Sequence, residues 1–156
     1  MAEALDTLSA QLDFLRKWYE QQIPFNRVIG LQVETLRVDF VSIRFSMREE
    51  LIGNAVHGIL HGGVISSVLD ATGGLAAAAS ILEKMQGRSA EEIATRIARI
   101  GTIDLRVDFL RPGRGEFFRA KSAIMRSGNK VAVTRMEFFS NKEILIAVGT
   151  GTYIVG

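Results

Sequence analysis

The chain has 156 residues, 47% hydrophobic and 23% charged, a composition typical of one globular domain that buries its own core. Its net charge is only +2 and it has no cysteine, which excludes a disulfide framework, a thiolate nucleophile and a cysteine-based metal site. No apolar run reaches the roughly eighteen residues of a membrane span, and the acidic start lacks the basic segment of a secretory signal, so we expect a cytoplasmic protein.

The first predicted element is an amphipathic helix over residues 6–20. Apolar side chains recur there at helical spacing, and Asp6 or Thr7 supplies the N-terminal cap. Pro24 is expected to end this helical segment.

A strand hairpin and a long helix are expected next. Residues 29–35 and 41–47 alternate between apolar and polar positions, which predicts two paired strands. The following helix spans about 62–82. No charged residue lies between Asp70 and Glu83, so most of its surface is expected to be buried.

Small residues make up the second half of this helix, among them the adjacent Gly73 and Gly74. Two neighbouring glycines weaken a helix. Their lack of side chains therefore predicts the close approach of a sheet or of a ligand.

A second helix and a run of strands complete the predicted elements. Ser89–Glu92 matches a capping box that begins the helix. After Gly101 the alternation is that of antiparallel strands, at residues 103–109, 117–126, 130–139 and 144–154. The expected fold class is α+β, with an antiparallel sheet wrapped around a long helix.

The most informative motif is Asn54 followed by His61-Gly62-Gly63 and, nine residues after His61, by Asp70. An unpaired carboxylate at the edge of an apolar stretch is costly to bury, so Asp70 has either a structural partner or a chemical role. His61 could equally cap the helix or contact a ligand. The chain has no Gly-x-Ser-x-Gly, Walker or Gly-x-Gly-x-x-Gly motif, and its two histidines lack the spacing of a structural zinc site.

This motif and the order of elements resemble the hotdog fold, in its PaaI-like acyl-CoA thioesterase branch and, more narrowly, in a YigI-type group of bacterial proteins. Segments 102–112 and 126–133 are similar to strands of the same branch. The resemblance covers about residues 25–155. It implies a hotdog domain at 25–156 preceded by an N-terminal helical extension at 1–24.

The resemblance also implies a site that hydrolyses acyl-CoA thioesters to free acid and CoA. Asp70 would be the nucleophile or the general base, and the N–H of Gly62 at the helix N-terminus would polarise the thioester carbonyl. His61 would hold the site in shape or contact the thioester, and Asn54 would orient water or the substrate. Thr102 falls where the family often has a hydroxyl that positions water.

Basic residues of the second half are candidates for contacts with the CoA phosphates. Residues 83–156 hold thirteen Lys or Arg against eight Asp or Glu, in no dense run, which suits a small polyphosphate better than nucleic acid. We expect substrate contacts from Gly63, Arg111, Arg114, Arg126 and Lys130. The alternative is that these basic side chains are ordinary solvated surface.

The family site is shared between two subunits, so the resemblance implies a homodimer or a dimer of dimers. Asp70 of one subunit would face His61 and Gly62 of the other. An edge strand, either 144–154 or the central one, could pair across a dimer and so remove exposed edges. No metal or redox cofactor is required.

Medium or long acyl chains are favoured as the substrate, lying along the helix where Gly73 and Gly74 leave space. Two alternatives stay open. One is a hotdog dehydratase or hydratase, and the other is a protein that binds acyl-CoA without turning it over.

Overall fold

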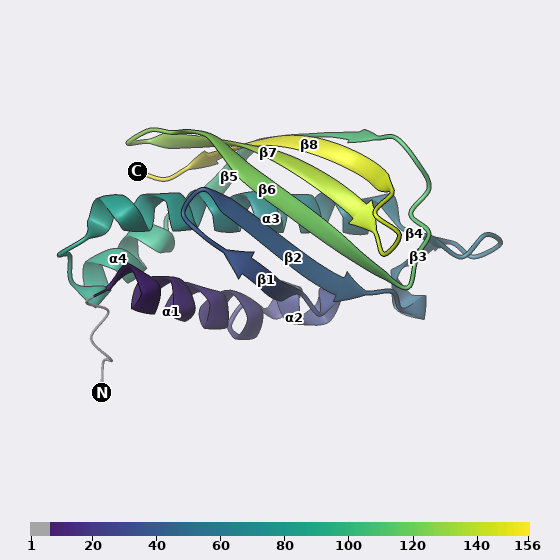
Figure 1. The fold of residues 1–156 in the computed structure, drawn as a ribbon, viewed down its shortest axis with the longest axis horizontal. Coiled ribbons are helices and arrows are strands. Elements are labelled where there is room, and N and C mark those ends of the chain that lie inside the picture. Colours follow the sequence, from purple (N-terminus) through teal and green to yellow (C-terminus); the bar gives the residue numbers. More distant parts are fainter. Residues whose placement is uncertain (1–6) are drawn as a thin grey trace.

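A six-stranded antiparallel sheet wraps around one long helix in the computed structural model, which describes residues 7–156 (Figure 1). The sheet order is β1-β2-β6-β7-β8-β5, and every neighbouring pair is antiparallel. The strands are β1 Gln32–Leu36, β2 Phe40–Ser46, β5 Gly101–Phe109, β6 Phe117–Ser127, β7 Val131–Ser140 and β8 Leu145–Ile154. This arrangement confirms the α+β hotdog fold.

In the described part of the chain, three shorter helices accompany the central one, on the side away from the sheet (Figure 1). The helices are α1 Leu8–Gln21, α2 Pro24–Ile29, α3 Gly62–Leu82 and α4 Ala90–Ile97, with short 3₁₀ turns at Glu49–Leu51 and Glu83–Met85. A two-stranded hairpin, β3 Ile52–Asn54 and β4 Ile59–Leu60, leads into α3. The predicted capping box is confirmed, because Ser89 and Glu92 bond reciprocally at the start of α4.

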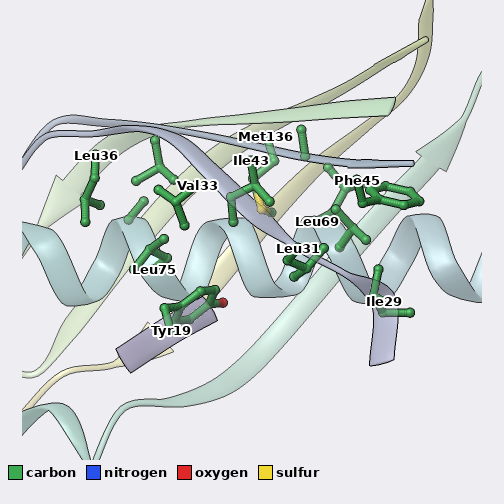
Figure 2. Packing of buried hydrophobic residues seen from close by; sticks show 14 of the residues in the cluster. Tyr19, Ile29, Leu31, Val33, Leu36, Ile43, Phe45, Leu69, Leu75 and Met136 are labelled. Atoms are coloured by element: carbon green, nitrogen blue, oxygen red, sulfur yellow. The ribbon is translucent and has the colours of Figure 1, made fainter. Parts of the chain in front are cut away.

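Helix α3 is the core of the fold, as its lack of charge predicted. It packs on β2, β6, β7 and β8, while α1 covers it from the other side. Figure 2 shows Leu69 and Leu75 of α3 among the apolar side chains of the β1–β2 hairpin. The segment Gly62–Met85 is long and apolar enough to cross a membrane by composition alone, but 67% of its most apolar window is buried inside the protein. Its hydropathy is therefore that of a core helix.

Gly73 and Gly74 have different surroundings. A Cβ on Gly73 would lie 2.2 Å from the Tyr153 hydroxyl oxygen and 2.6 Å from the Met136 sulfur, so this glycine lets β7 and β8 approach the helix. A Cβ on Gly74 would meet only the Tyr153 ring, at 3.6 Å. The expectation that both glycines leave space for a ligand is therefore wrong for Gly73, whose space is filled by the sheet.

The N-terminal region differs from its prediction in one respect. Thr7 caps α1 by accepting a hydrogen bond from the Ala10 N–H, as predicted. Pro24, however, begins the additional helix α2 at a position where its missing N–H costs nothing, and Ile29 lies in that helix instead of in a strand. Leu15 of helix α1 packs in the same core as the rest of the chain. The predicted boundary between an N-terminal extension (1–24) and a hotdog domain (25–156) therefore stays a prediction.

The sheet edges also differ from expectation. Residues 144–154 form β8, which lies between β7 and β5, so this strand is not an edge and cannot pair across a dimer. The edges are β1 and β5. Ile103 and Phe109 of β5 and the adjacent Leu110 are 57%, 54% and 49% exposed, so apolar side chains are exposed at both ends of this unpaired edge strand.

Candidate active site

The N-terminus of α3 presents one free main-chain donor. His61 caps the helix, and its Nδ1 accepts a hydrogen bond of 2.8 Å from the Gly63 N–H. The His61 N–H donates to the Leu51 carbonyl at 2.9 Å, which ties the cap to the preceding turn. Among the described residues, no acceptor contacts the Gly62 N–H. This N–H is therefore not used within the described chain and lies at the positive end of the helix dipole, where it can stabilise developing negative charge.

The β3–β4 hairpin holds Asn54 close to this terminus. Gly53 packs so tightly that a Cβ there would lie 2.6 Å from the His61 Cα. The Asn54 side-chain oxygen accepts from the His57 N–H at 3.2 Å, and Arg114 donates to the His57 carbonyl at 2.8 Å. Asn54 is thus positioned as a turn residue beside the helix N-terminus.

Asp70 lies half-buried two turns further along α3. Its Oδ1 accepts a hydrogen bond of 2.8 Å from the Thr102 hydroxyl at the start of β5. No Lys, Arg or His in residues 7–156 forms an ion pair with it. The carboxylate is oriented by a neutral donor and keeps its remaining acceptor positions, as a nucleophile or general base requires.

Two tyrosines that the sequence analysis missed fix the backbone at this point. The Tyr153 hydroxyl donates to the Asp70 carbonyl at 3.1 Å, and the Tyr19 hydroxyl donates to the carbonyl of Ala71. Burial raises the pKa of both phenols, and the negative charge of Asp70 raises it further, so both remain protonated donors. Their partners lie 83 and 52 residues away, so no local pattern could have revealed them.

A cavity of about 320 Å³ opens beside Asp70. Asp70, Thr102 and Ser67 supply polar groups, and the walls otherwise come mostly from apolar side chains of α1, α2 and the α4–β5 segment. Gly74 lines this cavity, whereas Gly73 does not. A carboxylate beside an apolar cavity suits chemistry on the polar end of an apolar substrate.

Gly62 and Asp70 lie too far apart on one helix to act on the same atom. Eight residues separate them, which is about 12 Å along the axis at the α-helical rise. One carbonyl group cannot contact both the Gly62 N–H and the Asp70 carboxylate of a single chain. A site that uses both groups needs two chains.

The predicted basic residues divide between two ends of the molecule. Arg111 and Arg114 lie in the β5–β6 loop, beside the β3–β4 hairpin, where each donates to a main-chain carbonyl. Arg126 and Lys130 flank the β6–β7 turn, near the C-terminal end of α3 (Figure 1). One protomer therefore does not bring the four together.

Lys130 lines a second, larger groove of about 800 Å³. Its other charged side chains are Lys84, Arg88, Arg96, Arg99, Glu91 and Glu92, an excess of cations. Gly63 is exposed, but its N–H already serves the His61 cap. In residues 7–156, no three His, Asp or Glu side chains are arranged to hold a metal ion.

Comparisons with known proteins agree with this geometry. A sequence model of the thioesterase superfamily matches residues 57–147. The medium/long-chain acyl-CoA thioesterase YigI of Escherichia coli K12 is 42% identical over 153 residues, which cover 98% of this chain and 99% of that protein. The protein of the same name from Salmonella typhimurium is also 42% identical, with the same coverage.

Two solved structures are also similar to this chain over nearly their whole length. A crystal structure from Shewanella oneidensis, related to the thioesterase superfamily, superposes with a TM-score of 0.91 at 42% identity, covering 96% of this chain and 97% of that one. A structure from Syntrophus aciditrophicus has a TM-score of 0.85 at 44% identity, covering 95% and 97%.

Proposed function

Because this chain belongs to the thioesterase superfamily, we propose that it hydrolyses medium- or long-chain acyl-CoA esters to the free acid and CoA. The observation that carries the proposal is the Asp70 carboxylate, oriented by Thr102 beside an apolar cavity. The 42% identity to medium/long-chain acyl-CoA thioesterases, over nearly the whole length of both chains, supports the substrate class. We place the protein in the PaaI-like branch and in the cytoplasm.

The proposed reaction begins at the thioester carbonyl. Its oxygen accepts a hydrogen bond from the free Gly62 N–H, which stabilises the negative charge that develops on addition. Asp70 either attacks the carbonyl carbon and forms an anhydride, or removes a proton from the attacking water. In both routes the C–S bond breaks and the CoA thiolate leaves, taking a proton from water or from the Asp70 carboxyl. In the anhydride route a water molecule then attacks the anhydride, which releases the free acid and restores the Asp70 carboxylate. Thr102 holds the carboxylate in place, while His61 and Asn54 shape the helix N-terminus.

Assembly is the second part of the proposal. The distance between Gly62 and Asp70 on α3 supports a site in which each group comes from a different subunit. The β5 edge, with exposed Ile103 and Phe109, offers a surface that a second copy would cover by strand pairing. The protein is therefore a homodimer or a dimer of dimers.

The CoA phosphates are the third part. The groove that contains Lys130 holds five cationic side chains against Glu91 and Glu92. No hydrogen bond or ion pair involves the side chains of Arg99 and Lys130 within residues 7–156, so both are available to an anion. This groove therefore suits the phosphates better than Arg111 and Arg114, whose guanidinium groups already bond main-chain carbonyls.

A free-thiol release assay tests the proposed function. The full chain should release CoA thiol from decanoyl-CoA and palmitoyl-CoA. Hydration of an enoyl-CoA without thiol release would instead indicate the hydratase alternative. Binding of acyl-CoA without either reaction would indicate a non-catalytic acyl-CoA-binding protein.

A further inference from the structure

We infer that Gly74 on α3 and Trp18 on α1 set the length of acyl chain that the protein accepts. The inference rests on the proposed thioesterase function and adds a specificity role to two residues outside the reacting groups. Trp18 belongs to α1, which lies outside the segment matched by the superfamily. The N-terminal helix would thus adapt a common thioesterase core to its own substrates.

One face of α3 forms the floor of the cavity. Ser67, Asp70, Ala71, Gly74 and Ala78 line it, and steps of three or four residues place them on the same side of a helix. From Asp70 to Ala78 the floor runs for about 12 Å. The cavity therefore extends from the carboxylate toward the C-terminal half of the helix.

Most polar groups around the cavity are already bonded within the protein. The Ser67 hydroxyl donates to the Gly63 carbonyl, and the Asn26 amide nitrogen donates to the Tyr19 carbonyl. The two tyrosine hydroxyls donate to carbonyls of α3. Beyond Asp70, the cavity thus offers few free polar partners and favours an apolar chain as occupant.

The volume suits a medium-length chain. The cavity measures about 320 Å³, near the lower end of the roughly 300–1,000 Å³ range of small-molecule pockets, so it limits the length of chain that fits. A second cavity of about 240 Å³ lies between α1 and α4. Leu15, Trp18 and Ile97 line both cavities and so form the wall between them.

Gly74 controls the floor because a side chain there would point into the cavity. Its Cβ would make only an ordinary contact of 3.6 Å with the Tyr153 ring, so the backbone tolerates substitution. Replacement by leucine also improves helix propensity, because glycine is one of the weakest helix formers. Gly74→Leu therefore fills the cavity without weakening α3.

Trp18 is the main side chain in the wall between the two cavities. It is only partly buried, and its ring is the largest side chain shared by the two cavities. Trp18→Ala should join the cavities and admit longer chains. The two substitutions thus predict opposite shifts in chain-length preference.

The first experiment measures kcat/KM by thiol release along a series from butanoyl-CoA to stearoyl-CoA. Gly74→Leu should lower kcat/KM for the longest esters about ten-fold or more, and leave the shortest within about two-fold. Trp18→Ala should shift the optimum to longer esters. Ala123→Leu, at an exposed position of β6, adds a leucine far from the cavity and should leave the profile unchanged.

A binding experiment keeps the inference testable without turnover. Trp18 is the only tryptophan, so its fluorescence reports directly on the cavity. Titration with n-alkan-1-ols should show affinity rising about four-fold per added methylene until the cavity is full. In Gly74→Leu the affinity should stop rising at a shorter alcohol.

These experiments distinguish failure of the chain-length role from failure of the proposed thioesterase function. Hydrolysis with an unchanged profile in Gly74→Leu, or with equal loss at every chain length, would overturn the chain-length role alone. Alkanol binding without hydrolysis of any acyl-CoA would overturn the proposed function and leave an apolar-chain site. Opposite shifts in Gly74→Leu and Trp18→Ala support the inference.

Discussion

At the scale of single residues, Asp70 is distinguished by its position beside an apolar cavity and by having one neutral donor, Thr102. Asp70→Asn keeps the shape of the side chain and removes its ability to attack or to accept a proton. We expect kcat to fall about a hundred-fold or more with the melting temperature little changed. Asp13→Asn, at an exposed position of α1, is the matched control and should keep full activity. An Asp70→Asn enzyme within a few-fold of the parent would refute the assignment.

A proline at position 62 would remove the main-chain N–H at little structural cost. Proline is favoured at the first position of a helix, and His61 already has the extended backbone that precedes proline well. Gly62→Pro should therefore lower kcat about a hundred-fold or more while the protein stays folded.

Gly62→Ala is the control for this experiment. It retains the N–H, and its Cβ would meet the Phe109 ring at an ordinary 3.5 Å. It should keep most of the activity. If the proline and alanine variants behave alike, this N–H does not bind the carbonyl.

The local part of the site could be predicted from the sequence, and the distant part could not. His61, Gly62 and Asp70 share one helix, so their relation follows from spacing alone. The Thr102–Asp70 contact was not predicted, since 32 residues separate the partners and the resemblance assigned Thr102 only to the positioning of water. Tyr19 and Tyr153 looked like ordinary apolar positions, because only the folded chain brings their hydroxyls to α3.

At the scale of elements, an ion-pair network fastens β1 to β6. Arg119 donates to both oxygens of Glu34 and, at 2.9 Å, to Glu143. The hydrogen bonds from Arg119 hold the pKa of Glu34 below its ordinary value of 4.5. The folded state thus favours the ionised carboxyl, and its contribution is present above pH 4.5 and is lost as the pH falls through the lowered pKa.

Glu34→Gln should accordingly destabilise the protein by about 1 kcal/mol or less near pH 7, since both side chains are partly exposed. The difference from the parent should shrink at an acidic pH below the lowered pKa of Glu34, where the parent carboxyl is protonated as well. Urea unfolding at the two pH values measures it. A difference that stays constant between them would mean that the pair does not stabilise the sheet.

The helices and strands whose apolar residues recur regularly along the sequence were predicted well. Features that depend on which elements lie next to each other in the fold were not. The bounds of α3 and of the late strands follow directly from charge-free and alternating runs. Proline is compatible both with the end of one helix and with the first turn of the next, so Pro24 alone does not predict that α2 begins there. That β8 is an interior strand depends on sheet order, which alternation does not encode.

At the scale of the whole molecule, the groove at the C-terminal end of α3 should recognise the nucleotide part of CoA. Substituting Arg99 and Lys130 together by Gln should raise KM for acyl-CoA far more than KM for an acyl-pantetheine. Added salt should weaken the binding of the acyl-CoA and hardly affect the binding of the acyl-pantetheine. The control pair, Arg111→Gln with Arg114→Gln at the other end, should not discriminate between them. Equal effects of the groove substitutions on both substrates would place the phosphates elsewhere.

The central claim is that hydrolysis uses Asp70 of one subunit and the Gly62 N–H of another. The most direct test mixes Asp70→Asn and Gly62→Pro proteins, each inactive alone, under conditions where subunits exchange. Random pairing gives half mixed dimers with one intact site each, so thiol release should recover to about one quarter of the parent value. No recovery after confirmed exchange, or full activity in a protein that light scattering shows to be a monomer, would contradict the account.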